Sequence, residues 1–548
     1  MIEFNSTIEA FLHWEKETPK NTFLIQNFEG HQHVFSYYEA GREVRKMASY
    51  LLQLKLPEKS HVALLSKNCS HWILAELAIS MAGYISIPIY PTLGARGVNQ
   101  ILTHSEAKAI IIGKLDNFKS QKNGIPNIHM ISVKIFGEQV GRSWEEIIEK
   151  EAELLDFSMP KVNQLQTIIY TSGTTGKPKG VMHTFGNFSI SAKTLGGLSK
   201  LPLYPKFFSY LPLAHVAERC AYNLILFQGG QLIFAHSLDS FSKNLMAVQP
   251  DLFFAVPRIW GKFQEKILET IPYKNLTLLL LSIPILNTIV KKKIKKKLGL
   301  SKARFIASGA APISSDLVKW YSKIGITIQQ IYGMTEDCCI SHSNTQGQSK
   351  NGTVGKSLEG VTTKRSEGGE ILIHNSCLFK GYYKAPDITA TVFDEDCYFK
   401  TGDIGDYDDE GYLTITGRIK DQFKTDKGKY ISPSPIELKI SKNTDIEQIC
   451  LVGFGLPQPM ALVTISILGK AKTKVELSES LQQSIEEVNA SLKKYEQIEK
   501  IVVMMDEWNT TNGFTTPSLK IKRHSLEKVF QSSYYKWYAS EQRVVFEA

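Results

Sequence analysis

Residues 170–181 read YTSGTTGKPKGV and directly follow the β-branched, apolar run TII at 167–169. This pattern predicts a strand that ends in a phosphate-binding loop. Glycine permits φ values that other residues resist, so successive N–H groups can point inward at an anion. Serine and threonine hydroxyls add donors, and two lysines add positive charge. The candidate phosphate ligands are Thr171, Ser172, Gly173, Thr174, Thr175, Gly176, Lys177, Pro178 and Lys179.

The loop differs from the Walker phosphate loop, which needs four residues between its glycines and a Ser or Thr straight after its lysine. Here two residues separate Gly173 from Gly176, and Pro178 follows Lys177. The simpler interpretation is a flexible surface loop rich in glycine and threonine. Because the run is uninterrupted and follows a strand, we favour the phosphate loop.

Length and composition limit the kinds of protein in which such a loop could function. The 548 residues are 43% hydrophobic and 22% charged, which is typical of a soluble globular protein with several lobes and large cores. The formal charge is +10, but six of the 64 basic residues fall in one heptad at 291–297, so the excess is partly local. The sequence does not alternate basic and aromatic residues in the way that is typical of nucleic-acid-binding proteins. We therefore do not expect this protein to bind nucleic acid.

The cysteines and the chain ends indicate the compartment. Seven cysteines contain no CxxC pair and form no metal-like grouping with the histidines, which indicates a reducing compartment without structural zinc. Acidic residues stand in the first segment where a secretory signal would be basic and then apolar, and the last residues are not SKL. We therefore expect a cytoplasmic protein.

The first 165 residues alternate helical and extended patterns. We expect strands at 61–66, 85–89 and 109–112, and helices at 71–82 and 97–105. Such alternation predicts a parallel sheet covered by helices on both faces. This region contains no residue pattern that points to chemistry.

Residues 276–297 combine an apolar run with the lysine heptad. The apolar part, 276–290, is shorter than the roughly 20 residues of a spanning helix and contains Pro284 and Asn287, which argues against a transmembrane helix. An apolar face beside a basic cluster can rest on an anionic membrane surface. This interpretation predicts a peripheral contact with the inner face of a membrane. The alternative is a partly buried helical hairpin with a solvated lysine face.

Two distant stretches point to one nucleotide. At 304–314, RFIASGAAPIS predicts a strand and a turn in which Gly309, Ala310 and Ala311 leave room for a flat group. At 329–336, QQIYGMTE offers an aromatic ring, a glycine, a hydroxyl and a carboxylate in succession. Tyr332 can stack on a base, Thr335 can bond a phosphate, and Glu336 can hold Mg2+. The residues between them are Gly333 and Met334.

Two further stretches supply charge. YFKTGD at 398–403 contains Asp403, a carboxylate that can accept both ribose hydroxyls. GRIKDQFKT at 417–425 contains Arg418, whose guanidinium can support the ribose or a phosphate. The simpler interpretations are a surface aspartate in a glycine turn and an arginine at a strand end.

Together with TPSLKIKR at 516–523, these stretches resemble the adenylate-forming superfamily in sequence and in order. That superfamily includes acyl-CoA synthetases, luciferases and nonribosomal adenylation domains, and the resemblance covers essentially the whole chain. LPLAHVAER at 211–219, KGKYISPSPIE at 427–437 and the spacing of TPSLKIKR look most like the long-chain fatty acyl-CoA synthetases, including the bubblegum-type group.

The resemblance implies a two-step reaction with ATP, Mg2+ and coenzyme A. A fatty carboxylate attacks the α-phosphorus of ATP to give acyl-AMP and pyrophosphate; the thiol of coenzyme A then takes the acyl group and AMP leaves. The resemblance places adenine against Gly309, Ala310, Ala311 and Tyr332, and the ribose on Asp403. It places Mg2+ at Glu336 and Thr171, with Thr335 beside them.

Lys520 is the expected lysine for the α-phosphate and the attacking carboxylate, because an ammonium can bring two anions together against their repulsion. The superfamily often has Ser-Gly-Lys here, whereas Ser518 and Leu519 precede Lys520. The missing glycine leaves Lys522 as the competing assignment.

The resemblance also implies a moving domain. In that superfamily a small C-terminal domain rotates about a hinge just after the Gly-Arg of GRIKD, which is Lys420 here. Lys520 would face ATP in one orientation, and the loop at 424–430 would face the thiol in the other. We expect a large multi-lobed α/β domain at 1–419 and a small mobile α+β domain at 420–548, strand-like at 451–467 and helical at 478–495.

Three alternatives stay open. An adenylation partner of a carrier protein shares the ATP residues; LGGLS at 195–199 resembles a carrier attachment site but lies inside the large domain, and the chain ends soon after Lys520, so we expect no carrier domain. A fatty acyl-AMP ligase would pass its adenylate to a separate carrier. A non-catalytic lipid-binding relative would not need Glu336, Asp403 and Lys520.

Overall fold

The computed structural model describes residues 2–28, 30–171, 178–235, 237, 240–271, 284–516 and 519–547, and only the backbone at 284–286. Six predicted phosphate ligands lie outside these residues, as does the first part of the apolar run, 276–283. Those six are Ser172, Gly173, Thr174, Thr175, Gly176 and Lys177.

A seven-stranded sheet confirms the predicted alternation in the first 165 residues. All its neighbouring strands are parallel except the last pair, which is an antiparallel hairpin. In sheet order the strands are β7 (Arg142–Ser143), β6 (His129–Ser132), β5 (Ala109–Ile112), β3 (His61–Leu65), β4 (Ile85–Ile89), β8 (Leu165–Thr171) and β9 (Lys179–Thr184). The candidate phosphate loop therefore connects β8 and β9, and Thr171 pairs with Lys179 at its base.

A nine-stranded sheet forms the second large layer. Its central strands are parallel, and both edges are antiparallel. In order the strands are β16 (Lys356–Ser357), β15 (His342–Ser343), β14 (Gln329–Tyr332), β13 (Phe305–Ser308), β12 (Leu252–Ala255), β10 (Lys206–Ser209), β11 (Gln231–Phe234), β1 (Thr22–Phe28) and β2 (His31–Ser36). The strand predicted inside 304–314 is thus β13, beside β14.

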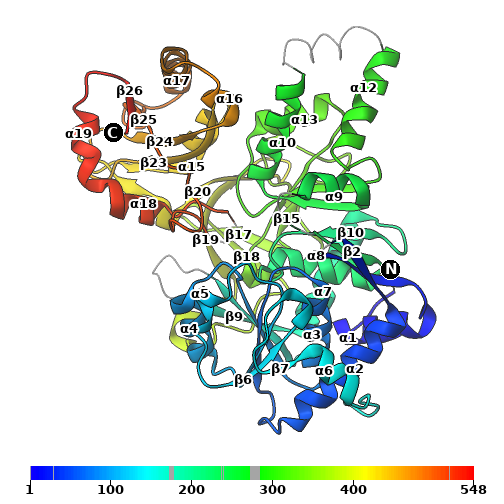
Figure 1. Ribbon diagram of the computed structural model, residues 1–548. Coiled ribbons are helices and arrows are strands. Elements are labelled where there is room, and N and C mark those ends of the chain that lie inside the picture. Colours follow the sequence, from blue (N-terminus) through cyan, green and yellow to red (C-terminus); the bar gives the residue numbers. More distant parts are fainter. Residues whose placement is uncertain are drawn as a thin grey trace.

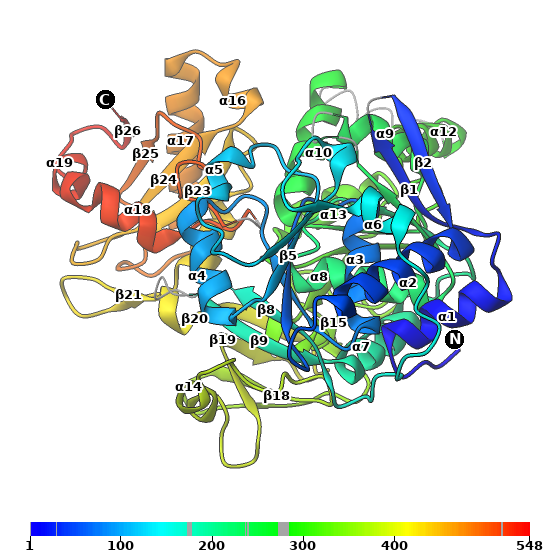
Figure 2. The ribbon, with the colours of Figure 1, turned by 60° about the horizontal axis from the view of Figure 1, so that its bottom comes forward.

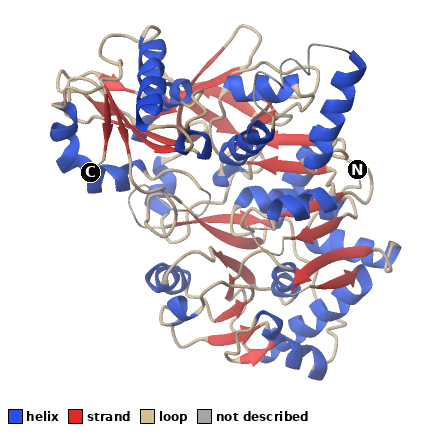
Figure 3. Cartoon of the chain, turned by 45° about the horizontal axis from the view of Figure 1, so that its top comes forward, coloured by secondary structure: helices blue, strands red, loops and turns tan. Residues whose placement is uncertain are grey.

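Helices fill the space between the two sheets and cover their outer faces (Figure 3). The largest hydrophobic core contains Leu74 of α3 and Leu224 of α8, together with strand residues of both sheets such as Ile169 and Phe207. The helices of this part are α1 (Thr7–Glu17), α2 (Tyr37–Gln53), α3 (Ser70–Met81), α4 (Ala95–Ser105), α5 (Lys119–Lys122), α6 (Trp144–Lys150), α7 (Phe185–Ser199), α8 (Val216–Phe227), α9 (Phe241–Val248), α10 (Pro257–Thr270), α12 (Pro284–Lys297), α13 (Ser315–Lys323) and α14 (Pro386–Thr391).

An ion pair lies in the middle of this helical layer. The Arg219 side chain of α8 bonds the Glu76 carboxylate of α3, and neither side chain is exposed to solvent. Arg219 also donates to Thr167 Oγ1 of β8 at 2.7 Å. The pair therefore ties α8 to α3 and to the seven-stranded sheet.

A smaller antiparallel sheet packs against the hairpin of β8 and β9. Its strands are β17 (Thr362–Arg365), β18 (Glu370–His374), β19 (Phe399–Tyr407) and β20 (Leu413–Arg418). Met182 of β9 exchanges backbone hydrogen bonds with Gly381 and Lys380, so the residues before β19 run along the edge of β9. This contact brings β19 and β20 close to the base of the candidate phosphate loop.

The C-terminal part of the chain forms a separate α+β unit (Figures 1 and 2). It contains a four-stranded sheet of β23 (Ile446–Val452), β24 (Met460–Ile465), β25 (Lys500–Val503) and β26 (Val544–Phe546), and the short pair β21 (Phe423–Lys424) and β22 (Tyr430–Ile431). Its helices are α15 (Pro433–Ile440), α16 (Ile467–Lys470), α17 (Lys474–Asn489), α18 (Arg523–Phe530) and α19 (Tyr534–Tyr538). The segment 451–467, predicted as extended, is two strands separated by a turn, because Gly453 and Gly455 adopt positive φ.

The lysine heptad lies on α12. Ile294 is buried and packs in a core with Trp260 and Trp320, whereas Lys292, Lys293, Lys296 and Lys297 are exposed. In the part of the chain described here, no helix is long and apolar enough to cross a membrane. The exposed lysines of the heptad therefore lie on the solvated side of α12, and Ile294 lies on its packed side.

Candidate active site

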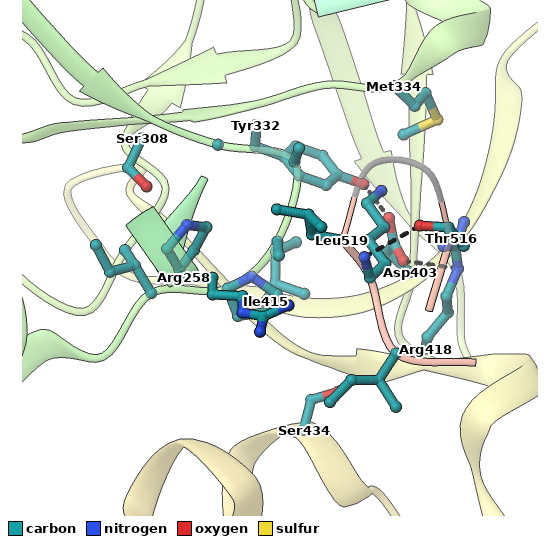
Figure 4. Close-up of a pocket in the computed structure, with 18 of the residues that line it drawn as sticks. Arg258, Ser308, Tyr332, Met334, Asp403, Ile415, Arg418, Ser434, Thr516 and Leu519 are labelled. Carbon is teal, nitrogen blue, oxygen red and sulfur yellow. Dashed lines mark hydrogen bonds and ion pairs between the residues drawn. The ribbon is translucent and has the colours of Figure 1, made fainter. Parts of the chain in front are cut away.

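A cavity of 2300 Å³ opens between the nine-stranded sheet, the small sheet and the C-terminal unit. Figure 4 shows part of its wall, with side chains from β13, β14, β19, β20 and the C-terminal loop that contains Leu519. The described candidates for the nucleotide site line this one cavity. They are Thr171, Pro178, Lys179, Gly309, Ala310, Ala311, Tyr332, Gly333, Met334, Thr335, Glu336, Asp403, Arg418, Lys420 and Lys520.

The turn after β13 is closely packed against its neighbour strand. A Cβ on Gly309 would lie 2.8 Å from the carbonyl oxygen of Ile331, so a larger residue would displace β14. Ala310 has a φ of 66°, which is unusual for a residue with a side chain. The backbone of this turn therefore reaches the cavity wall without a large side chain in front of it, as a flat ligand requires.

Asp403 connects two other candidate residues. Tyr332 donates its hydroxyl to Asp403 Oδ2 at 2.8 Å, and Arg418 Nε lies 3.3 Å from Asp403 Oδ1 (Figure 4). Burial raises the pKa of Asp403, although Arg418 opposes that shift, and Asp403 in turn raises the pKa of Arg418. Asp403 and Arg418 face each other across β19 and β20, so the strand register itself forms this pair.

The YGMTE segment makes a tight turn after β14. A Cβ on Gly333 would lie 2.6 Å from the backbone of Cys339, so glycine is required by close contact. Asp337 Oδ1 accepts the N–H groups of Met334 and Cys339 at 2.8 and 2.9 Å, which closes a single 3-10 turn at Thr335–Asp337. The turn directs Glu336 into the cavity.

Glu336 and Lys179 meet at the ring of Tyr382. The Tyr382 hydroxyl donates to Glu336 Oε1 at 2.8 Å, and Lys179 Nζ lies 4.8 Å from the centre of the Tyr382 ring. Desolvation lowers the pKa of Lys179, and repulsion from Lys420 lowers it further. The loop-base lysine, the hinge candidate and the carboxylate are therefore neighbours.

Three residues with a structural part in this site were missed by the sequence interpretation. Tyr382 orients Glu336, Asp337 closes the turn, and His183 Nε2 bonds the Thr335 carbonyl oxygen at 2.7 Å. The carboxylate after Glu336 was a detectable signal, because Asp at the end of a short turn often accepts backbone N–H groups. Tyr382 is brought to the site by the contact of residues 380–383 with β9, and His183 lies on β9 itself, far in sequence from the turn that it contacts.

Lys520 enters the cavity from the C-terminal unit. Its backbone N–H donates to Thr516 Oγ1 at 3.0 Å, and its carbonyl accepts from Thr516 N at 2.7 Å, which closes the loop on itself. Desolvation lowers the pKa of Lys520, repulsion from Arg418 lowers it further, and Asp403 opposes the shift. An anion bound among these cations would be strongly attracted.

Leu519 occupies the position where the resemblance expects a glycine. Its φ is 64°, in the left-handed region where residues with a side chain are disfavoured by roughly 1–2 kcal/mol. The loop therefore has the backbone shape that a glycine would adopt freely, and it keeps that shape with a leucine. Lys522, the competing candidate, is the N-cap residue of α18, and its N–H donates to the Phe514 carbonyl oxygen at 2.8 Å.

His215 and the hinge candidate complete the cavity wall. His215 is the N-cap residue of α8, where its Nδ1 accepts the Ala217 N–H at 3.2 Å, and burial with repulsion from Lys520 lowers its pKa to about 3. Lys420 lies in the single 3-10 turn Ile419–Asp421 between the small sheet and the C-terminal unit. His215 and Lys520 thus line the same cavity from the two units.

The chain matches the AMP-binding enzyme family over residues 11–383, and the C-terminal domain of AMP-binding enzymes over residues 420–542. The protein belongs to the AMP-binding enzyme family. The first match alone covers more than half of the chain, and it includes the β8–β9 hairpin and the YGMTE turn. For this family member, the resemblance inferred from the motifs is confirmed.

Curated relatives cover nearly the whole chain. The family member is 27% identical to the long-chain-fatty-acid–CoA ligase ACSBG2 of Xenopus laevis, over 92% of this chain and 80% of that protein. It is 27% identical to long-chain-fatty-acid–CoA ligase 5 of Rattus norvegicus over 92% and 84%, and 26% identical to the ligase FadD15 of Mycobacterium bovis over 90% of each.

Solved structures of low identity share the fold. The adenylation domain of a carboxylate reductase from Mycobacterium chelonae superposes with a TM-score of 0.82 at 19% identity, over 98% of this chain and 91% of that chain. The anthranilate CoA ligase AuaEII in complex with anthranoyl-AMP gives 0.78 at 18% identity, over 96% and 98%. The predicted fold class, a large α/β part and a smaller C-terminal domain, is confirmed.

Substitution of Leu519 tests the strain in the lysine loop. Isoleucine has the same volume, but its branched Cβ resists a positive φ more strongly. Leu519→Ile should therefore lower the free energy of local opening of this loop by roughly 1 kcal/mol. The Lys520 amide hydrogen should then exchange with solvent about fivefold faster. Native-state hydrogen exchange measures this rate.

Leu519→Gly is the matched control for that measurement. Glycine removes the strain but adds flexibility to the open loop, and these terms are of similar size. Exchange of the Lys520 amide should stay within about twofold of the natural protein. An isoleucine variant that exchanges as slowly as the natural protein would contradict the strained loop.

Proposed function

We propose that this protein is an ATP-dependent long-chain fatty acid:CoA ligase, which forms acyl-AMP and pyrophosphate and then acyl-CoA and AMP. One observation carries the proposal: Lys520 of the C-terminal unit reaches the cavity that contains Asp403, Glu336 and Lys179, and apolar side chains line another part of the same cavity wall. The similarity to named long-chain ligases over nine-tenths of the chain supports it.

The polar end of the cavity suits the first step. Adenine would lie against the turn Gly309–Ala311, which has no large side chains, and against Tyr332. The ribose hydroxyls would donate to the carboxylate of Asp403. Lys520 would neutralise the α-phosphate and hold the attacking fatty carboxylate beside it. The rate gain comes from positioning and from charge neutralisation, as in other phosphoryl and nucleotidyl transfers.

The phosphate loop at 170–181 would hold the β- and γ-phosphates. Of its nine candidate ligands, Thr171, Pro178 and Lys179 lie in the cavity wall. Thr171 pairs with Lys179 across the base of the hairpin. The residue with a hydroxyl group therefore ends β8 before the loop, and the residue with an ammonium group begins β9 after it.

Glu336 and Thr171 would hold Mg2+ together with the phosphates of ATP. Mg2+ is usually bound by one or two carboxylates plus phosphate oxygens and water, so one carboxylate such as Glu336 beside the phosphates is enough to hold this ion. When bound, the ion would neutralise the charge on the phosphates. Tyr382 orients Glu336 for this role, and the Thr335 carbonyl oxygen is held by His183.

The apolar part of the cavity wall suits a long hydrocarbon chain. Side chains of α7, α8 and the nine-stranded sheet form it: Leu195, Val216, Ala221, Leu224, Leu252 and Phe305. Burying each methylene group contributes about 0.8 kcal/mol, so a long acyl chain would gain more affinity there than a short one. We propose fatty acids as the acid substrate for this reason.

The second step needs the C-terminal unit to turn. We propose a boundary between residues 1–419 and 420–548, with Lys420 as the hinge, because a single exposed 3-10 turn can absorb a change in φ and ψ. After rotation the loop at 424–430 would face coenzyme A. The acceptor distinguishes this proposal from a fatty acyl-AMP ligase that delivers its acyl group to a carrier protein.

AMP release across a panel of acids, with and without coenzyme A, tests the proposed function. Long-chain acids should give AMP release that requires coenzyme A and exceeds that with short acids. Acyl-AMP that accumulates without any response to coenzyme A would favour the acyl-AMP ligase instead. No nucleotide turnover with any acid would contradict both enzymes and favour a lipid-binding relative.

Lys520→Ala should reduce acyl-AMP formation by about a hundredfold or more, because it removes the positive charge at the reacting phosphate. Thioester formation from supplied acyl-AMP should remain, since that step does not use this lysine. Pyrophosphate release and thioester formation are measured separately. Lys522→Ala is the matched control and should change neither rate substantially. Equal loss of both half-reactions in Lys520→Ala would contradict the assignment.

We also propose that the exposed lysines of α12 contact an anionic membrane surface. Each lysine near such a surface contributes about 1 kcal/mol, so replacing four by glutamine should weaken binding to anionic vesicles about a hundredfold or more. Activity on soluble short acids should not change. The four are Lys292, Lys293, Lys296 and Lys297, and scattered exposed control residues are Lys59, Lys108, Lys119 and Lys122. Equal loss of vesicle binding in the control variant would contradict a specific face.

A further inference from the structure

An ion pair crosses the boundary between the large part of the chain and the C-terminal unit. Arg258, in the first turn of α10, lies with Nη2 at 2.6 Å and Nε at 3.2 Å from Glu447 Oε1, at the beginning of β23. The side chains are 19% and 9% exposed. A carboxylate so little exposed needs a partner, and its partner belongs to the other unit.

Charged side chains of both units surround this pair. Lys262, one turn after Arg258 on α10, places Nζ 3.4 Å from the same Glu447 oxygen. Burial and the nearby Glu447 raise the pKa of Glu265 on α10 to about 7. The C-terminal unit adds Glu507, whose pKa Lys470 lowers first and the two cations of α10 lower to a smaller extent. Arg258 and Lys262 of α10 thus face carboxylates of the C-terminal unit, whereas Glu265 of α10 repels Glu447 and opposes this attraction.

A second contact across the boundary is more exposed. Lys442 Nζ lies 2.8 Å from Asp316 Oδ2 of α13, with side chains 56% and 43% exposed. Exposed pairs of this kind contribute little, typically less than 1 kcal/mol. The Glu447 contact is therefore the main polar restraint among the ion pairs described between the units. The helices α10 and α16 lie side by side at this boundary (Figure 1).

Glu447 and Lys520 belong to one rigid group of the C-terminal unit. Arg523, three residues after Lys520, bonds the Leu451 carbonyl oxygen of β23, the strand that begins with Ile446 and Glu447. Arg523 Nη2 also lies 2.7 Å from Glu437 of α15. The strand that carries Glu447 and the loop that carries Lys520 are thereby held together, so fixing one against the large domain fixes the other.

We infer that Glu447 is a positioning residue for acyl-AMP formation, and that Arg258 and Lys262 hold it so that Lys520 stays in the cavity. The inference rests on the proposed two-step function. Turning the C-terminal unit for the thioester step takes Glu447 away from α10, so this pair stabilises only the first orientation. Neutralising it should shift the balance of orientations towards the second one.

Glu447→Gln tests this role because it keeps the side-chain shape and removes the charge. Pyrophosphate release with a fatty acid should fall about fivefold to tenfold, whereas thioester formation from supplied acyl-AMP should stay the same or increase. The second half-reaction also checks that the variant is folded. The matched control is Glu541→Gln, an exposed carboxylate of the same unit, which should leave both rates unchanged.

A double-mutant cycle identifies the partner. Lys262 also contacts Glu447, so the cycle is measured in a Lys262→Met background. There, Arg258→Met should slow pyrophosphate release to an extent similar to Glu447→Gln, and the variant with both substitutions should lose no more than either one, because one interaction is removed once. Losses that multiply would show that the two residues act separately and would overturn the pair as the positioning contact.

Energy transfer between dyes on residues 269 and 479 reports the orientation without any reaction. Residue 269 is exposed on α10 and residue 479 on α17. In the natural protein without substrate one distance should dominate, and Glu447→Gln should broaden or shift it. An unchanged distance together with unchanged pyrophosphate release overturns the inference. Absence of acyl-AMP from the natural protein with every acid overturns the proposed function instead, while the distance still tests the contact.

Discussion

The buried ion pair of Glu76 and Arg219 holds together the layer between the two large sheets. Both side chains are inaccessible to solvent, and Thr167 supplies a further acceptor for the guanidinium. Removing one partner of such a pair commonly costs about 3–5 kcal/mol, because the other charge stays buried without compensation. The pair therefore specifies how α8 sits against the seven-stranded sheet.

The position of α8 in turn shapes the cavity. Its first residues follow His215, which caps the helix and lines the same cavity as Lys520, and its side chains Ala221 and Leu224 belong to the apolar part of the cavity wall. The other walls come from strands of the nine-stranded and small sheets, from α10 and α13, and from the C-terminal unit. A displacement of α8 would thus change polar and apolar parts of the cavity wall together, which connects an interaction deep in the core to the candidate active site.

The polar end collects positive charge from several elements. Lys179 comes from β9, Arg418 from β20, and Lys420 and Lys520 from either side of the C-terminal unit. Repulsion among them contributes to the lowered pKa values of Lys179 and Lys520, and the nearby carboxylates Asp403 and Glu336 compensate only in part. A polyphosphate would relieve this repulsion, so the site gains electrostatic stability when an anion binds.

The sequence by itself determined the alternation of strands and helices, the identity of the nucleotide motifs and the family, because these depend on local periodicity and on short runs of unusual composition. It did not separate β23 from β24, since an apolar run with an internal glycine turn resembles one long strand. Only the tertiary structure decided that Tyr382 and His183 support the YGMTE turn, that Leu519 takes the backbone shape of a glycine, and that Arg258 meets Glu447. The contacts of Tyr382, His183 and Arg258 join residues far apart in the chain, and no local pattern encodes which distant side chains meet. The conformation of Leu519 is local, but it is one that a residue with a side chain rarely adopts.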